Sequence, residues 1–248
     1  NNKKALVGYL VAGDPDIETT VELMKLFSSS GVDIIEIGVP FTDPIAEGPI
    51  IQKAHDRALK KDISLVSIFQ MIEKYREFDD ETPLVLMGYL NTFIYHKKLI
   101  ENNQNDAVDS ILVVDIPGEL NLEDYGVKSN NINTISLISP TTKKDRVKLI
   151  AENSTGFLYY VTLRGVTGSS NLNIDEIKNN IEEIKRYASV PTLAGFGIKS
   201  IEDAKLLADC SDGIIIGSSL VQMIEQGSEK KEFDRIGKYI SEIKKAIS

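Results

Sequence analysis

The sequence predicts an α/β protein folded as a single (β/α)8 barrel, and three observations support this prediction. Eight short apolar runs rich in β-branched residues recur along the 248-residue chain. Most of these runs are continuously apolar, as expected for strands buried on both faces of a parallel sheet. Between them lie segments with one apolar stripe at helical spacing. Eight such units in about 250 residues match the usual size of this barrel.

The predicted strands follow one another at fairly even spacing. They span residues 5–11, 32–39, 83–89, 108–116, 133–139, 157–163, 190–197 and 212–217. Helices are predicted from apolar stripes formed by Ile17, Val21, Met24 and Phe27, by Leu65, Ile68, Ile72 and Tyr75, and by Ile174, Ile177, Ile181, Ile184 and Ala188. Asp14 precedes Pro15 at an expected first helical position. Ser200 stands three residues before Asp203, as in a capping box.

An open doubly wound sheet is the alternative arrangement of strands and helices. Its Gly-x-Gly-x-x-Gly motif after the first strand is missing, because Gly8 and Gly13 do not give that spacing. No linker or composition break divides the chain, so residues 1–248 are expected to form one domain. Two loops are expected to be long, about residues 40–60 after the second strand and about 164–174 after the sixth. Loops that follow barrel strands are where catalytic residues lie.

Composition excludes several classes of function. The chain has 28 Lys and Arg against 37 Asp and Glu, a net charge of −9, which argues against nucleic acid or a membrane surface as the main partner. No run of eighteen apolar residues predicts a membrane span. The single cysteine, Cys210, excludes an internal disulfide, and we expect a cytoplasmic protein. One cysteine and two distant histidines do not make a structural zinc site.

Glu36 is the clearest candidate catalytic residue. It lies inside the apolar segment 34–39, where a carboxylate needs either a partner or a function. Strand alternation places it on the face of Ile34 and Gly38. If that face points into the barrel, burial raises the pKa of the carboxyl and suits it to proton transfer. The alternative is a structural carboxylate paired with a donor from a neighbouring strand.

Glu47 lies eleven residues further on, in the long loop that follows the second strand. It can bring a second carboxylate over the same barrel mouth, and two carboxylates in different environments can divide acid and base roles. The alternative is an ordinary solvated charge. For Asp43 and Asp14, roles in turns or helix caps are the simpler interpretation.

Glycines near the ends of the last two strands predict a phosphate site. Gly195-Phe196-Gly197 ends the seventh strand and Gly217-Ser218 ends the eighth. Many barrels bind phosphate there through backbone N–H groups, which Gly lets approach closely. Gly168, in the loop after the sixth strand, can add a third side. An acidic chain can hold phosphate in this way because the attraction comes from local N–H dipoles.

Two absences narrow the chemistry. No lysine lies near the carboxyl end of a predicted strand, which argues against Schiff-base catalysis. His55 and His96 fall in or beside helical stretches, which disfavours a catalytic metal, so none is predicted. Any bond cleavage would then rest on general acid/base catalysis.

The sequence around these residues resembles that of the tryptophan synthase α subunit family. The segment 35–49, with Glu36 and Glu47, is similar to the family's motif at the second strand and its loop. Further similar motifs occur in the same order at residues 13–15, 115–117, 165–168, 195–197 and 217–218. The match covers essentially the whole chain. The strand-two motif separates this family from other phosphosugar barrels, which share only the phosphate glycines.

The resemblance implies reversible retro-aldol cleavage of indole-3-glycerol phosphate to indole and D-glyceraldehyde 3-phosphate. Glu36 matches the acid/base residue, Glu47 the carboxylate that faces the indole N–H, and Tyr159 an active-site tyrosine. The residues that match substrate-binding positions are Tyr9, Leu112, Leu137 and Thr167, and those that match phosphate-binding positions are Gly168, Phe196, Gly197, Gly217 and Ser218. Glu47 departs from the family, which usually has Asp there.

The resemblance also implies a partner. A pyridoxal-phosphate-dependent β subunit receives the indole in an α2β2 complex, so the cofactor belongs to that partner and none is expected in this chain. Asp43, Asp115 and Pro117 match positions near the β contact. Two alternatives remain open at this stage: another phosphosugar isomerase or synthase on the same barrel, and a non-catalytic subunit that only activates its partner.

Overall fold

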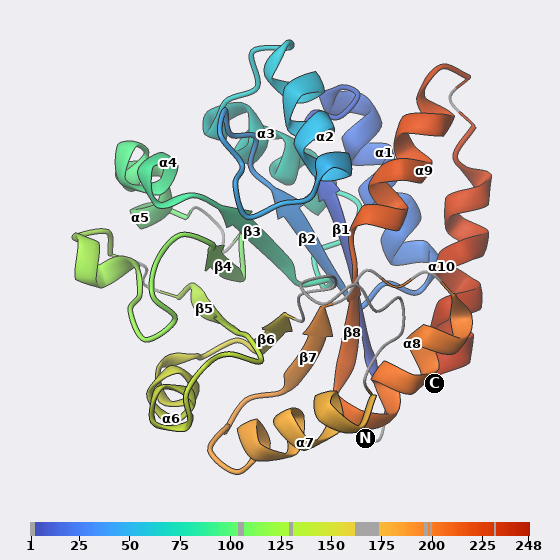
Figure 1. The fold of residues 1–248 in the computed structure, drawn as a ribbon. Helices are drawn as coiled ribbons and strands as arrows, with labels where there is room; N and C mark the ends of the chain where they lie inside the picture. Colours follow the sequence, from blue (N-terminus) through green and yellow to red (C-terminus); the bar gives the residue numbers. More distant parts are fainter. Residues whose placement is uncertain are drawn as a thin grey trace.

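In the described part of the chain, eight parallel strands close into a barrel (Figure 1). The computed structural model describes residues 3–103, 107–128, 131–161, 174–195, 198, 200–230 and 232–248. Each strand pairs with the next one in sequence, and β8 pairs with β1 to complete the circle. The predicted (β/α)8 barrel is confirmed, and the open doubly wound sheet is excluded by this closure.

Every predicted apolar run contains one strand. The strands are β1 Ala5–Val11, β2 Ile34–Gly38, β3 Leu84–Gly88, β4 Ser110–Val113, β5 Asn133–Ile138, β6 Leu158–Val161, β7 Thr192–Gly195 and β8 Gly213–Ile216. Most are shorter than the runs that predicted them, because apolar residues continue beyond the strands into buried turns. Val32 and Val39, for example, are buried on either side of β2 but lie outside it.

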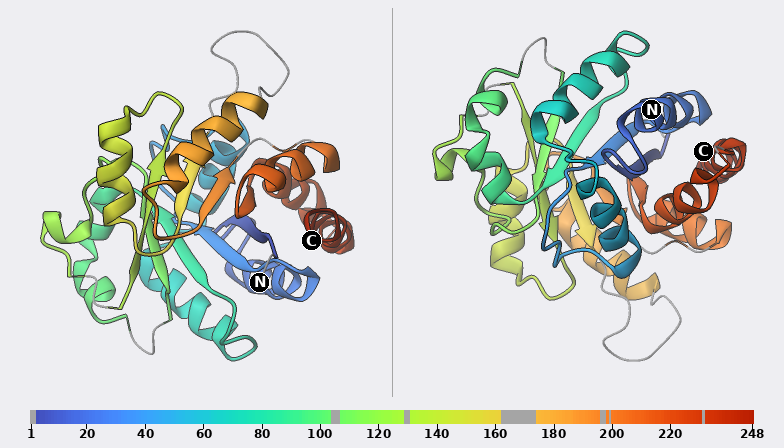
Figure 2. Two further views of the ribbon diagram at one scale, coloured as in Figure 1. Left: turned by 90° about the horizontal axis from the view of Figure 1, so that it is seen from below. Right: turned by 90° about the horizontal axis from the view of Figure 1, so that it is seen from above.

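The helices lie outside the barrel and cover its strands (Figures 1 and 2). They are α1 Ile17–Ser30, α2 Pro49–Leu59, α3 Leu65–Arg76, α4 Leu90–Tyr95, α5 Lys97–Glu101, α6 Lys144–Asn153, α7 Ile174–Lys185, α8 Ile201–Cys210, α9 Ser218–Ser228 and α10 Asp234–Ile247, with a 3-10 helix at Leu122–Tyr125. The three predicted apolar stripes fall on α1, α3 and α7, although Ala188 lies beyond the end of α7. No helix in the described ranges is long and apolar enough to cross a membrane.

The first helix begins later than predicted. Pro15 lies before α1, and Asp16 is the N-cap, because its carboxylate accepts a hydrogen bond from the N–H of Thr19 at 2.7 Å. Asp14 is 2% exposed and forms a two-pronged ion pair with Arg57, at 2.8 Å for each contact. The placement of Pro15 at the first helical position was therefore wrong. The cap at Ser200 is confirmed, since its hydroxyl accepts from Asp203 N–H.

The connection after β2 contains more helix than expected. The predicted loop of about residues 40–60 is irregular only as far as Gly48, because Pro49 opens α2. Ala54, His55 and Ala58 give α2 a buried face, which packs near β1 and α9. The predicted loop at about 164–174 lies outside the described residues apart from Ile174, the first residue of α7.

An apolar layer fills the barrel interior below the candidate site. Its buried members are Val7, Val85, Leu112, Ile135, Phe157, Leu193 and Ile215. Val7 pairs with Ile34, and Tyr9 pairs with Glu36 two residues further along each strand. Glu36 and Tyr9 therefore stand one layer closer to the carboxyl-terminal mouth than this apolar layer.

Candidate active site

Glu36 lies in the barrel interior with no exposed surface. Neither of its carboxylate oxygens has a hydrogen-bond partner among the described residues. Desolvation by burial, with a smaller contribution from the charge of Glu47, raises the pKa of Glu36 to about 8. The side chain is therefore mainly protonated near neutral pH and can give up its proton, so the alternative of a structurally paired carboxylate does not hold in this part of the chain.

Glu47 is only partly buried and lies in the loop between β2 and α2. The hydroxyl of Tyr89 donates a short hydrogen bond to its carboxylate, and the Gln52 side chain donates to its backbone carbonyl at 2.9 Å. Burial raises the pKa of the Glu47 carboxyl, while the Tyr89 hydrogen bond opposes that rise. Because Glu47 also raises the pKa of Glu36, the two carboxylates belong to one electrostatic site. Glu47 is therefore held in place rather than solvated freely.

Tyr89 is a residue that the sequence analysis missed. It immediately follows β3, and its ring stacks on Phe41, with centroids 4.5 Å apart and planes at 13°. Its hydroxyl also accepts a hydrogen bond from Ala46 N–H at 3.0 Å. The ring and the hydroxyl together fix the loop that carries Glu47. The alternation of β3 marks Tyr89 only as an apolar boundary residue, so no local signal points to this role.

Two further tyrosines stand near Glu36. Tyr9 pairs with Glu36 in the strand register. Desolvation by burial raises the pKa of both Tyr9 and Tyr159; the charges of Glu47 and then Glu36 add to the rise at Tyr9, and the charge of Glu36 adds to the rise at Tyr159. Tyr159 lies on β6, and its ring occupies the space where a side chain at position 195 would stand, which is why Gly195 has none. The structure thus brings three of the predicted residues together at one end of the barrel.

The predicted apolar pocket residues differ in their exposure. Leu112 is fully buried in the interior apolar layer, whereas Leu137, which packs against that layer, is partly exposed. Thr167 lies outside the described residues. The assignment of these side chains to substrate binding remains a prediction.

Gly217 and Ser218 form the start of helix α9, directly after β8. Val221 N–H bonds back to the Gly217 carbonyl as the first bond of the helix, so the N–H groups of the residues between them have no acceptor within the helix. A methyl group added to Gly217 would lie in ordinary van der Waals contact with the side chains of Tyr9 at 3.7 Å and Ile51 at 3.8 Å, so this backbone faces the same end of the barrel as Tyr9. Gly168, Phe196 and Gly197, the other predicted phosphate residues, lie outside the described residues.

Asp43, Asp115 and Pro117 are all exposed and follow strands β2 and β4. Asp115 accepts a hydrogen bond from Leu90 N–H at 2.8 Å, at the first residue of α4. An exposed position at the mouth is compatible with a partner contact, and that assignment remains a prediction.

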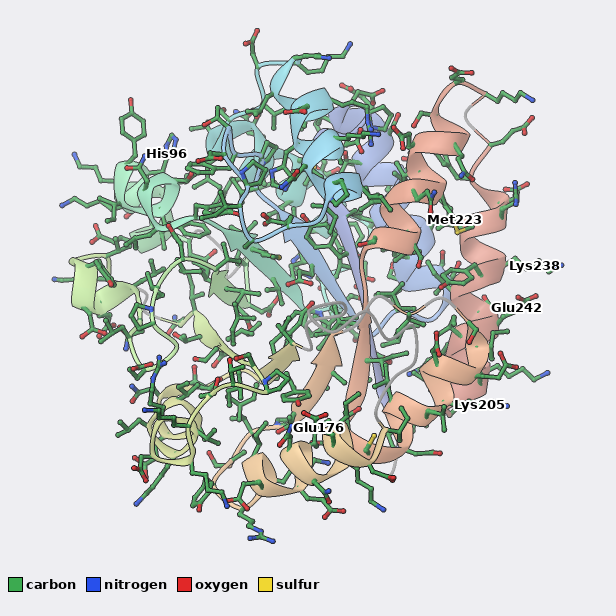
Figure 3. The ribbon with its side chains drawn as sticks, in the orientation of Figure 1. His96, Glu176, Lys205, Met223, Lys238 and Glu242 are labelled. Atoms are coloured by element: carbon green, nitrogen blue, oxygen red, sulfur yellow. The ribbon has the colours of Figure 1, made fainter. Side chains whose placement is uncertain are left out.

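The two histidines occupy different surroundings. His96 stands at the outer rim between α4 and α5, away from the barrel interior (Figure 3). His55 is buried on α2, where its ring nitrogens face Phe41 N–H and the Tyr9 hydroxyl. The described ranges contain no group of three or more His, Cys, Asp or Glu residues that could hold a metal ion.

A closed parallel barrel with two carboxyl groups of raised pKa toward its carboxyl-terminal mouth is typical of an enzyme of the (β/α)8 class. Comparison with known proteins identifies the family to which this barrel belongs. The family model described as "Tryptophan synthase alpha chain" matches residues 1–248, and the chain belongs to that family. It is accordingly an indole-3-glycerol-phosphate lyase.

Individual relatives agree along the full length. The chain is 42% identical to the tryptophan synthase alpha chain of Neisseria meningitidis serogroup B over 247 residues, which cover 98% of this chain and 94% of the relative. A crystal structure of the α subunit from Legionella pneumophila str. Paris aligns with a TM-score of 0.89 and 38% identity, covering 100% and 94%. A chain from the tryptophan synthase α2β2 complex of Pyrococcus furiosus aligns with a TM-score of 0.83 and 30% identity, covering 97% and 98%.

Proposed function

We propose that, in the reversible cleavage of indole-3-glycerol phosphate to indole and D-glyceraldehyde 3-phosphate, Glu36 is the general acid and base and Glu47 is the carboxylate that receives the indole N–H. One observation carries the assignment of roles. Glu36 is buried without a hydrogen-bond partner among the described residues and has a pKa of about 8, whereas Glu47 accepts a hydrogen bond from Tyr89. The first side chain is suited to giving up a proton and the second to carrying a negative charge.

Cleavage begins with proton transfer. Glu36 gives its proton to indole C3, and the positive charge that forms is shared with the ring nitrogen. The Glu47 carboxylate stabilises this charge through a hydrogen bond from the indole N–H. Tyr89 uses one oxygen of that carboxylate and leaves the other for the substrate.

The carbon–carbon bond breaks in the second step. Glu36, now a carboxylate, takes the proton of the glycerol hydroxyl on the carbon bonded to C3. The oxygen forms the aldehyde carbonyl, the C3–carbon bond breaks, and its electron pair restores the neutral indole ring. The ring itself stores the electrons, so the step needs neither a Schiff base nor a metal. Tyr159, on β6 across the barrel from β2, is proposed to contact the reacting atoms.

The phosphate of the substrate is proposed to bind at the start of α9. The backbone N–H groups after Gly217 and the hydroxyl of Ser218 supply donors, and the helix dipole favours an anion. From the sequence, Gly168, Phe196 and Gly197 complete this site. Leu112, Leu137, Tyr9 and Thr167 are proposed to surround the indole.

The chain is proposed to work with a β chain. The similar chain from Pyrococcus furiosus comes from an α2β2 complex of tryptophan synthase, and pyridoxal phosphate in this family belongs to the β chain. Asp43, Asp115 and Pro117, exposed at the barrel mouth, are proposed to contact that partner. Indole released here would then pass to the partner's site.

The test is release of indole from indole-3-glycerol phosphate by the purified chain, with and without a tryptophan synthase β chain. We expect indole in both conditions, with faster release in the complex. No indole under either condition would contradict the proposal. Indole release at the wild-type rate by a Glu36→Gln chain would instead remove Glu36 from the role of acid and base.

A further inference from the structure

His55 is a buried titratable side chain that the proposed reaction does not use. It lies on α2 and is 1% exposed. Both of its ring nitrogens face polar atoms: Nδ1 lies 3.0 Å from the backbone nitrogen of Phe41, and Nε2 lies 3.4 Å from the hydroxyl of Tyr9. The ring therefore connects the start of the Glu47 loop with a tyrosine inside the active site.

The hydrogen-bond partners fix which nitrogen carries the proton. Burial lowers the pKa of His55 to about 4, so the ring is neutral near pH 7 and has one N–H. The backbone N–H of Phe41 can only donate, so Nδ1 must accept. The proton then stands on Nε2, which donates to the Tyr9 hydroxyl. The separation of 3.4 Å is at the long end for such a bond.

The direction of this bond determines what the Tyr9 hydroxyl can do. A phenol oxygen that accepts from His55 still has its own proton to donate. Tyr9 is 2% exposed and stands opposite Glu36 in the pairing of β1 with β2. Its hydroxyl occupies the space beside Gly38, where any side chain would collide with it. The hydroxyl thus stands next to Gly38, two residues beyond Glu36 on the same face of β2 and nearer the barrel mouth.

The carboxylate oxygens of Glu36 have no hydrogen-bond donor among the described residues. Once it has protonated indole C3, it is a carboxylate buried without a hydrogen-bond partner among the described residues, which is energetically costly. A donor already held in place stabilises such a charge without reorganisation during the reaction.

We propose that His55 is a positioning residue, which holds the Tyr9 hydroxyl so that its proton is directed to Glu36 when Glu36 becomes a carboxylate. This inference rests on the function proposed for Glu36. It predicts that His55 affects turnover through Tyr9 and Nε2, and that the contact of Nδ1 with the Glu47 loop is secondary.

Two substitutions distinguish the contributions of the two ring nitrogens of His55. In His55→Asn the side-chain oxygen stands where Nδ1 was, so the Phe41 contact is kept and the reach to Tyr9 is lost. In His55→Gln the amide nitrogen reaches the position of Nε2, so the Tyr9 contact is kept and the Phe41 contact is lost. We expect kcat for indole release to fall about tenfold in His55→Asn and less than about threefold in His55→Gln, with KM nearly unchanged in both, because one hydrogen bond is at stake.

Tyr9→Phe removes the hydroxyl and keeps the ring, so it tests the same step without altering His55. It should lower kcat about tenfold, and adding His55→Asn to it should cause no further loss, because the two residues act as one unit. A wild-type kcat in Tyr9→Phe, additive losses in the double variant, or a larger loss in His55→Gln than in His55→Asn would each overturn the inference. Failure of the proposed function would appear differently, as no indole release by the wild-type chain.

Discussion

Carboxylates at the two ends of the barrel have opposite surroundings. At the amino-terminal end, Asp33, Asp109 and Asp212 each stand one residue before a strand. Each accepts a hydrogen bond from the first part of the preceding strand, at the N–H groups of Leu6, Leu84 and Thr192, over 2.6, 2.8 and 2.8 Å. Each also pairs with a cation from a helix: Lys244, Arg76 and Lys185 respectively.

At the carboxyl-terminal end, Glu36 has neither kind of partner within the described residues. The aspartates at the base tie strand to strand and strand to helix, so their charges contribute to stability. Burial raises the pKa of Glu36 instead, and a raised pKa is the property that proton transfer near neutral pH requires. The aspartates at the base therefore serve stability, whereas Glu36 serves chemistry.

Glu36→Gln should have the largest effect on activity. The amide has nearly the same shape but cannot transfer a proton, so we expect kcat for cleavage to fall about a thousandfold, within the range of lost general acid/base catalysis. Thermal unfolding should occur at the wild-type temperature or higher, because a buried ionisable group without a partner is removed. The measurements are indole release and a calorimetric Tm.

A large drop in Tm with this substitution would place Glu36 among the structural acids. Turnover like that of the wild type would remove its role as acid and base.

Glu47 should show a smaller and graded effect. We expect Glu47→Ala to lower kcat about a hundredfold through loss of the charge that faces the indole N–H. Glu47→Asp should stay within about fivefold of wild type, because the carboxylate is kept and moved by one methylene. Steady-state kinetics of both variants provide the check, and an Ala variant with normal turnover would make Glu47 an ordinary loop charge.

The fold was largely predictable because its signals are local. Each strand was predicted from an apolar run, and Glu36 stood out for the same reason, as the one charged residue in the apolar segment 34–39. The start of α1 was misplaced because Asp14-Pro15 and Asp16 both carry local start signals. Burial of Asp14 against Arg57, 43 residues away, decides between them.

The surroundings of the site were not predictable in the same way. Tyr89 meets Glu47 across 42 residues, and His55 meets Tyr9 across 46. No periodicity connects positions so far apart; only the closure of the barrel brings them together. The cations that pair with Asp33, Asp109 and Asp212 could not be predicted either, because they lie 211, 33 and 27 residues away in the sequence.

Asp109→Ala should affect stability without affecting chemistry. It removes the acceptor for Leu84 N–H and the partner of Arg76, so we expect a loss of about 2 kcal/mol in the free energy of unfolding, with kcat unchanged at 25 °C or below. Asp80→Ala, which alters an exposed acid in the loop before β3, is the matched control and should change stability by less than about 0.5 kcal/mol. Urea unfolding with parallel activity measurements would contradict the separation if Asp109→Ala lost turnover while remaining folded.

The pH dependence of cleavage gives the smallest but most direct comparison. Glu36 must carry its proton to begin the reaction, and burial raises its pKa from 4.5 to about 8. The active form is therefore present below about pH 8 and is lost as the pH rises through that value. We expect kcat/KM to fall about tenfold per pH unit above it. The aspartates at the base should leave this profile unchanged, so Asp109→Ala should keep the same midpoint, whereas a midpoint near 4.5 in the wild type would mean that Glu36 is solvated like an ordinary surface acid.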